Sequence, residues 1–440
     1  MKASVAQKRL AAFDPVLRSG RVRKILATHI EADGPNVPLG TLCAVEAGSA
    51  DTGSSFQAEV VGVDHDHIVL VPLEEGIPTF SGASVKANAR PENMPVGAAF
   101  LGRAVDALAR PFDGEGPIRA DAFSPLHGRV LSPLDRCSPS QIVETGVRGV
   151  DGLLSLGEGQ RIGIFAPSGA GKTSLMGQIA RQTAADIVIL CLVGERGREV
   201  EALWRRSFSA KDRARATLVA ATSDQSAAMR VRACSYALSL AEYWRDEGKH
   251  VLFLLDSVTR LAMALREIGL AAAEPPTVRA YTPSVFNALP KIVERCGAID
   301  KGGAITAIMT VLSETEEIDD PISEVMKSLL DGHILLSREL AEQGHFPAID
   351  IKRSVSRQAE NLVPPKQAGQ ARQVREWLSI YEGSKMLIET GLYVAGTSPD
   401  IDRAVERHPH IVRFLKQAAD QCSTLAATGE ALSQLTRGKI

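Results

Sequence analysis

Hydrophobic residues follow three different patterns along this chain of 440 residues. From residue 21 to about residue 95 they form short runs such as TLCAV, FQAEVVGV and HIVLVPL. Polar stretches such as EADGPN and AGSADTGSS separate these runs. Short strands with turn residues at this spacing are typical of all-β folds. The pattern therefore predicts a small β-barrel domain over residues 21–95.

The second pattern, between about residues 149 and 357, alternates continuous apolar runs with segments of helical spacing. The runs are RIGIF, DIVILCLVG, HVLFLLD, GAITAIMTVL and HILLS. Strands that are apolar on both faces are typical of parallel sheets covered by helices. The sequence thus predicts an α/β domain with a parallel sheet, to which we assign residues 96–365.

The third pattern is helical and continues from Gly369 to the end of the chain. Two apolar stripes with helical spacing are Val374, Trp377, Leu378 and Tyr381, and then Ile411, Phe414, Leu415 and Ala418. Such stripes indicate amphipathic helices that pack on one face. We expect a C-terminal helical domain over residues 366–440.

The N-terminal segment, residues 1–20, has a weaker pattern. Between residues 3 and 19, apolar residues lie among charged ones at a spacing that suits a short amphipathic helix. Such a helix could dock a partner. A frayed terminus is the other interpretation, and the sequence does not decide between them.

Composition narrows the classes of function. The formal net charge is −2, so the chain has no overall positive field for sequence-independent binding to nucleic acid or anionic lipid. No run of about 18 apolar residues is present, so we expect no membrane-spanning helix. The six cysteines lie far apart and never form a C-x-x-C pair, so we expect buried thiols in a reducing cytosol.

The stretch IFAPSGAGKTSLM, residues 164–176, carries the strongest chemical signal. An apolar strand leads into a glycine-containing turn and a Lys-Thr pair, which matches the phosphate-binding loop (P-loop) of nucleotide hydrolases except that Ala166 replaces the first glycine. Alanine is acceptable there if its φ is negative. The residues expected to bind nucleotide are Ala166, Pro167, Ser168, Gly169, Ala170, Gly171, Lys172, Thr173 and Ser174.

The P-loop residue types predict distinct roles. We expect the Lys172 ammonium to contact the β and γ phosphates, and the Thr173 hydroxyl to bind Mg²⁺. Asp256 ends the apolar run HVLFLLD and is the candidate for the magnesium shell.

Two further charged residues follow strands of the same predicted sheet. Glu195 comes after DIVILCLVG, at the edge where ligands of open α/β sheets bind, and could polarise the water that attacks the γ phosphate. The alternative for Glu195 is a surface ion pair with Arg196 or Arg198. Arg260 either turns back toward the phosphate or simply caps the helix that it begins.

The order of motifs around these residues is more specific. The stretches GERGREV, DSVTR, EPPTVRAYTPSVFNALPKIVERCG and SLLDGHILLSRELAEQGHFPAIDIKRSVSR closely resemble the catalytic subunits of the rotary ATP synthase superfamily. Within that superfamily they are most similar to the flagellum-specific ATPase of bacterial type III protein export. The resemblance covers most of the chain and is strongest from about residue 96 to 357.

This resemblance implies a RecA-like core and a homohexamer that hydrolyses ATP with Mg²⁺ at sites between subunits. It implies that Glu195 polarises water, that Asp256 lies at the end of the magnesium-binding strand, and that Arg357 of SVSR reaches a neighbour's site. From the residues alone, Arg357 is one cation in a basic cluster. The family commonly carries an aromatic that stacks on adenine shortly after this arginine, but QAENLVPPKQAGQAR has none.

The resemblance also implies partners and a location. We expect a stator-like regulatory protein at the N-terminus, a central-stalk-like protein, export-gate membrane proteins, and export cargo with its chaperones, but no nucleic acid. The protein is then cytoplasmic and peripherally associated with the inner-membrane export apparatus.

Four alternatives stay open. The ATPase of a virulence-type secretion system would keep the same catalytic residues. A proton-coupled ATP synthase subunit is disfavoured because GLYVAGTSPDID lacks the usual acidic run. A hexameric RNA translocase would need a basic, aromatic first domain, whereas the barrel region has only Phe56 and Phe80. A non-catalytic regulatory subunit would tend to lack Glu195.

Overall fold

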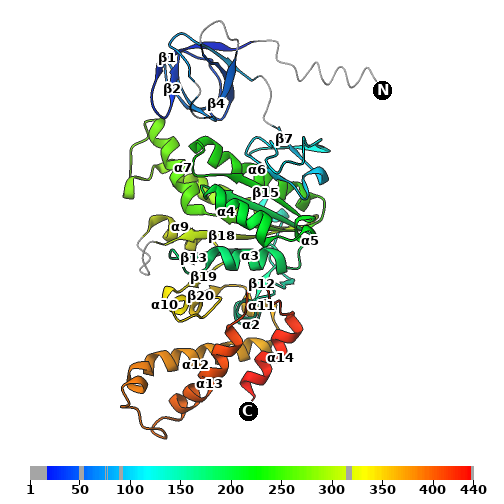
Figure 1. Ribbon diagram of the computed structural model, residues 1–440, viewed down its shortest axis with the longest axis vertical. Coiled ribbons are helices and arrows are strands. Elements are labelled where there is room, and N and C mark those ends of the chain that lie inside the picture. Colours follow the sequence, from blue (N-terminus) through cyan, green and yellow to red (C-terminus); the bar gives the residue numbers. More distant parts are fainter. Residues whose placement is uncertain are drawn as a thin grey trace.

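The computed structural model describes residues 17–48, 54–74, 76, 78–88, 93–313 and 320–437. Three parts follow one another along the longest axis: an N-terminal barrel, a central α/β domain and C-terminal helices (Figure 1). This arrangement confirms the predicted fold class of a mostly parallel α/β core with a small β-barrel before it and a helical domain after it.

The barrel is closed, with strand order β1-β2-β5-β4-β3-β6. Its strands are β1 (Ser19–Ile25), β2 (Ile30–Ala32), β3 (Leu42–Glu46), β4 (Ser55–Val63), β5 (Ile68–Pro72) and β6 (Ser84–Ala87). Alternate residues of β4, Phe56, Ala58 and Val60, are buried in its interior. The next strand, β7 (Asn93–Val96), pairs instead with β9 (Ala122–Pro125), so the barrel itself ends before residue 95.

The central sheet has the order β20-β19-β13-β18-β16-β14-β15-β8. Its strands are β8 (Ala104–Val105), β13 (Arg161–Ala166), β14 (Ile187–Val193), β15 (Ala216–Ala221), β16 (His250–Asp256), β18 (Ala304–Leu312), β19 (Gly332–Leu336) and β20 (Ile349–Ser356). Neighbours from β19 to β8 are parallel, whereas β20 is antiparallel to β19. The short β17 (Gly297–Ile299) is antiparallel to β18 and pairs with β10 (Arg136–Cys137).

Both faces of this sheet are buried, which explains the continuous apolar runs. In β14, Ile189 and Cys191 belong to one core cluster, whereas Val188 and Leu190 belong to the other. The first cluster includes α6 (Ala227–Asp246), α7 (Val258–Ala271) and α8 (Pro283–Glu294). The second includes α2 (Arg148–Leu153) and α3 (Lys172–Gln182). Helices therefore cover the sheet from both sides.

The C-terminal domain consists of α12 (Pro365–Glu389), α13 (Pro399–Leu415) and α14 (Leu425–Thr436). Val374, Trp377, Ile411, Phe414 and Leu415 are buried in the same cluster as α3. Most of the predicted stripes thus form the contact with the core. Ala418 was wrongly included, because α13 ends at Leu415 and Ala418 is exposed, whereas its neighbour Gln417 is buried.

Other expectations have mixed outcomes. Most of the N-terminal segment, residues 1–16, lies outside the described residues, and Ser19 already begins strand β1. Cys137 and Cys422 are exposed, so the expectation of buried thiols was wrong for them. Among the described helices, none is long and apolar enough to span a membrane.

Candidate active site

The P-loop connects the end of β13 to the start of α3. Ala166 is the last residue of β13. It is not among the described non-glycine residues with a positive φ, so alanine is acceptable at this position. Gly171 precedes α3 with φ 85°, a left-handed conformation that glycine adopts without strain. The free N–H groups at the start of α3 and its helix dipole favour an anion at this position. The local structure therefore provides a phosphate site.

A compact charged cluster lies beside this loop. Lys172 Nζ donates to Asp256 Oδ1 and is 3.7 Å from Glu195 Oε1. Side-chain exposure is 11% for Lys172, 7% for Glu195 and 3% for Asp256. Asp256 is the last residue of β16, and Glu195 lies two residues beyond β14. The carboxyl ends of three parallel strands thus bring these residues together, as the strand order predicts.

Arg260 also belongs to this cluster. It lies in the first turn of α7, and its Nε donates to Glu195 Oε1 at 3.0 Å. Its side chain approaches Gly194, where a Cβ atom would lie 3.0 Å from Arg260 Cδ. Gly194 has φ 69°, so glycine suits both the backbone turn and the close contact. Of the two predicted orientations of Arg260, the structure has the one directed toward the site.

The electrostatic environment of Glu195 is unusual. The pKa of its carboxyl is raised to about 7: burial is the largest cause, the negative charge of Asp256 and a hydrogen bond with Glu199 act in the same direction, and Lys172 and Arg260 oppose them. Desolvation disfavours the charged form of a carboxyl group, and a nearby like charge adds to this effect. A carboxyl with a pKa near neutrality is well matched to accepting a proton from water.

The residue types fit a magnesium ion. Mg²⁺ prefers oxygen ligands and commonly binds one or two protein side chains together with substrate phosphates. Thr173 is exposed at the start of α3, and Asp256 supplies a carboxylate at the end of β16. Among the described residues no group of three or more His, Cys, Asp or Glu side chains could hold a metal by itself. These two oxygen donors therefore suit an ion whose other ligands come from phosphate and water.

Arg357 is not part of this cluster. It follows β20, which runs antiparallel to β19, so that Ser356 pairs with Gly332 at the beginning of β19. The Arg357 backbone N–H donates to Asp331 O, and Asp331 in turn binds Arg161 at the beginning of β13. Arg357 is exposed and lies at the edge where the parallel strands begin. Lys172 lies at the opposite edge. The six-residue strand β13 separates the two edges by about 20 Å.

Two residues near the site were not predicted. Thr310 on β18 donates its hydroxyl to Asp256 Oδ1 at 2.7 Å, although nothing in its sequence context marks it. The ring of Phe346 lies beside the P-loop, because a Cβ atom on Gly171 would be 3.5 Å from Phe346 Cε1. Phe346 is 47% exposed. Its sequence context, GHFPAID, belongs to a stretch that carries the family resemblance, and the available signal was an aromatic three residues before the strand β20.

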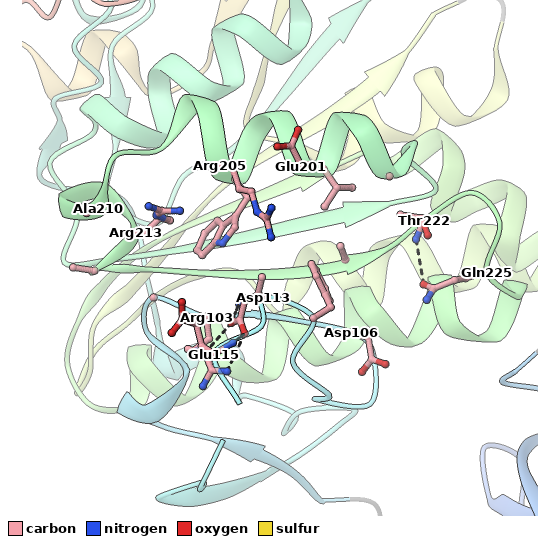
Figure 2. Close-up of a pocket in the computed structure, with 18 residues that line it drawn as sticks. Arg103, Asp106, Asp113, Glu115, Glu201, Arg205, Ala210, Arg213, Thr222 and Gln225 are labelled. Carbon is pink, nitrogen blue, oxygen red and sulfur yellow. Dashed lines mark hydrogen bonds and ion pairs between the residues drawn. The ribbon is translucent and has the colours of Figure 1, made fainter. Parts of the chain in front are cut away.

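A large hollow of about 1190 Å³ lies elsewhere, beside α4 (Gly197–Glu201) and the end of β15 (Figure 2). Arg205 and Arg213 line one side of the hollow. On the opposite side Arg103 Nε pairs with Asp113 Oδ2 at 2.8 Å. None of the P-loop residues lines it. We place the active site at the P-loop because the phosphate cradle and the carboxylates occur there, irrespective of hollow size.

Comparisons with known proteins agree with this location. The nucleotide-binding domain of the ATP synthase alpha/beta family matches residues 146–356. The C-terminal domain of the type III secretion ATPase EscN matches residues 363–434. The chain is therefore an ATPase of the ATP synthase alpha/beta family. Within it, the chain belongs to the group formed by flagellar and type III secretion ATPases.

Individual relatives cover almost the whole chain. The flagellum-specific ATP synthase of Bacillus subtilis (strain 168) is 42% identical over 96% of each chain. The type 3 secretion system ATPase of Sinorhizobium fredii is also 42% identical, over 95% of this chain and 92% of its own. Assembled EscN of enteropathogenic E. coli is 38% identical with a TM-score of 0.89, and its complex with the central stalk EscO gives 0.86. Both structures cover 94% of this chain and 99% of the solved chain.

Proposed function

We propose that this ATPase energises the export of flagellar proteins through the flagellar type III secretion apparatus. The observation that carries the proposal is the similarity to a flagellum-specific ATP synthase over 96% of both chains. The charged cluster supports it, since this chain holds a P-loop lysine and two buried carboxylates at the same sheet edge. A non-catalytic subunit would not need that arrangement.

The reaction assigned to the site is hydrolysis of the γ phosphate of ATP by water. Lys172 exchanges its contact with Asp256 for the phosphate oxygens and stabilises their developing charge. Glu195 orients the attacking water and accepts its proton. Arg260, which touches Glu195, is close enough to contribute positive charge to the same reacting groups.

Mg²⁺ is the second cofactor of this proposal. The Thr173 hydroxyl and the Asp256 carboxylate are the residues that would hold it. When bound, such an ion would supply positive charge that offsets the negative charge of the phosphates. The Thr310 hydroxyl, which already donates to Asp256 Oδ1, fixes the orientation of that carboxylate.

Arg357 is assigned to the active site of a neighbouring copy in a homohexamer. Its placement supports this role, because an exposed arginine at the edge where the parallel strands begin cannot reach the P-loop of its own chain. A ring in which the P-loop edge of one copy faces this edge of the next would complete each site. An arginine supplied from a neighbour stabilises the charge of phosphoryl transfer.

Phe346 is assigned to contact with the base of ATP. It is a half-exposed aromatic side chain beside the P-loop, and stacking on a flat base suits such a ring. It takes the place of the aromatic that the family carries after the arginine and that this sequence lacks. The segment between Arg357 and Arg372 is then not needed for base recognition.

Partners follow from the same functional proposal. A stator-like regulator binds the N-terminal segment, a central-stalk-like protein binds the ring, and export-gate proteins, chaperones and cargo meet it at the inner membrane. EscN is described in complex with its central stalk, which supports the second of these partners. No nucleic acid is involved. The protein acts in the cytoplasm, at the periphery of the membrane apparatus.

A virulence-type secretion ATPase is the second candidate function. It is favoured by a relative of equal identity, 42%, and by the match of the C-terminal domain to that of EscN. Deletion of the gene distinguishes the two functions. Loss of filaments and motility, restored by the intact gene and not by Lys172→Ala, supports the flagellar function. Normal filaments with failed secretion of effector proteins would support the other.

A further inference from the structure

The residues between α13 and α14, here called the 416–424 linker, connect the C-terminal helices to the nucleotide site. The linker is irregular in conformation and crosses from the end of α13 at Leu415 to the start of α14 at Leu425. Its contacts with the core are made largely by backbone groups, which do not depend on side-chain size. They reach two elements that border the P-loop, namely α3 and the residue Phe346.

Gln417 is the centre of these contacts. Its backbone N–H donates to Phe346 O at 2.9 Å. Its side-chain Oε1 accepts from the backbone N–H of Arg148 at 2.8 Å, and Nε2 donates to Gly146 O at 2.6 Å and to Gln421 O at 2.7 Å. The residue is only 5% exposed. Gln417 therefore uses its side-chain donors and its acceptor together to fix the linker on the core.

The rest of the linker holds the far end of the P-loop helix. Gln178 and Gln182 on α3 donate to the carbonyl of Gln421 at 3.3 and 3.0 Å. Arg181 donates to the carbonyl of Ala419 at 3.0 Å. The carbonyl of Gln421 thus receives bonds from both α3 and Gln417. A displacement of Gln417 would be felt at α3 and at Phe346 together.

We propose that Gln417 is a positioning residue for ATP binding: through the 416–424 linker it keeps the ring of Phe346 beside Gly171. Gln417 itself does not touch the nucleotide. This inference rests on the proposed contact between Phe346 and the base. The position of the C-terminal helices then becomes a determinant of nucleotide affinity.

Steady-state hydrolysis by the purified full-length chain tests this role. Gln417→Ala removes all three side-chain bonds, whereas Gln417→Glu keeps the size and the acceptor but cannot donate to the two carbonyls. We expect both variants to raise KM for ATP about three- to tenfold, because a buried hydrogen bond contributes a modest net stabilisation. The expected kcat stays within about twofold, since Gln417 acts on binding rather than on the chemical step.

A double-mutant cycle separates positioning from a general loss of structure. If Gln417 acts through Phe346, Gln417→Ala should change KM little once Phe346→Ala is present. Additive effects, or loss of kcat with unchanged KM, would overturn the proposal. Gln434→Ala is the matched control, since Gln434 is an exposed glutamine on α14 and should leave KM unchanged. Thermal melting shows whether each variant is folded, and Gln417→Glu carries the test if Gln417→Ala is not.

The same measurements distinguish failure of the positioning role from failure of the proposed function. Unchanged KM in both Gln417 variants, together with raised KM in Phe346→Ala, overturns the positioning role and leaves the base contact standing. Unchanged KM in Phe346→Ala overturns the base contact and the positioning role together. Absence of ATP hydrolysis by the wild-type chain would overturn the proposed reaction itself.

Discussion

Arg260 Nε donates to Glu195 Oε1 at 3.0 Å, and the same carboxylate oxygen is 3.7 Å from Lys172 Nζ. Two cations therefore face one carboxylate. Even so, burial and the nearby charge of Asp256 keep the pKa of Glu195 at about 7. The balance places the protonation of Glu195 in the range where cells operate, and it makes the carboxylate responsive to the loss of either cation.

The rate of hydrolysis should depend on pH through Glu195. Only the ionised carboxylate can accept a proton from water, and its pKa is about 7 in the free protein. The value of kcat/KM, which reports on the free enzyme, should therefore fall about tenfold per pH unit below about pH 7 and level off above it. Initial rates measured in buffers of constant ionic strength give this profile. A flat profile across that range would remove Glu195 from the role of base.

Glu195→Gln should bind ATP and turn it over slowly. The amide has the same size, so the phosphate cradle around Lys172 is unchanged, but it cannot accept a proton from water. Equilibrium binding of a fluorescent ATP analogue and single-turnover hydrolysis separate the two effects. The control is Glu201→Gln at the end of helix α4, because Glu201 pairs with Arg206 and should behave like wild type in both assays.

The same variant should alter the pH dependence of stability. Because the pKa of Glu195 is raised from about 4.5 to about 7, the native state retains a proton that the unfolded state releases in this interval. Wild-type stability therefore decreases as the pH rises through this window. Glu195→Gln has no such proton, so its melting temperature relative to wild type should increase from low to neutral pH. An unchanged difference would contradict the raised pKa.

Lys172→Ala should abolish hydrolysis. The variant loses the charge that contacts the transferring phosphoryl group, and Asp256 loses its ammonium partner. Phosphate release from ATP is the measurement, and Lys211→Ala, an exposed lysine on α5 (Ala210–Arg213), is the control. Residual turnover close to wild type would mean that the P-loop does not bind the reacting phosphate.

Much of this site could be predicted from the sequence because it follows from strand order. The P-loop motif is local, so its spacing alone locates Lys172. Glu195 and Asp256 each follow an apolar run, and the carboxyl ends of parallel strands meet at one edge. Their proximity to Lys172 therefore needs no knowledge of side-chain packing.

The remaining features depend on tertiary contacts that a local pattern does not contain. The side chain of Arg260 had two plausible directions, and the space left by Gly194 permits the one observed. Phe346 lies 175 residues after Gly171, its neighbour in the P-loop, and the two meet only because the turn before β20 borders the P-loop. The predicted apolar stripe reaches Ala418, whereas α13 ends at Leu415 and the linker residue Gln417 is buried through polar contacts with the core.

The last prediction concerns Arg357 and the oligomer together. Arg357 lies at the edge of the sheet where the parallel strands begin, away from the P-loop of its own chain. An arginine supplied by a neighbour can contribute about 10³ to 10⁵ in rate. Arg357→Ala should therefore bind ATP nearly normally and hydrolyse it poorly, even when rings are assembled. Arg353→Ala, which replaces an exposed arginine on the preceding strand β20, is the control and should retain activity.

Mixing experiments test whether the arginine acts between subunits. Arg357→Ala retains the P-loop, and Lys172→Ala retains the arginine, so a neighbouring pair of the two variants contains one complete site. Partial activity should return on mixing, provided that subunits exchange and that single sites can turn over. Mixed rings must be verified by native mass spectrometry or cross-linking, because failure of either condition would hide the effect. Undiminished turnover by assembled Arg357→Ala rings would refute the assignment without any mixing, because hydrolysis would then not need the charge of Arg357.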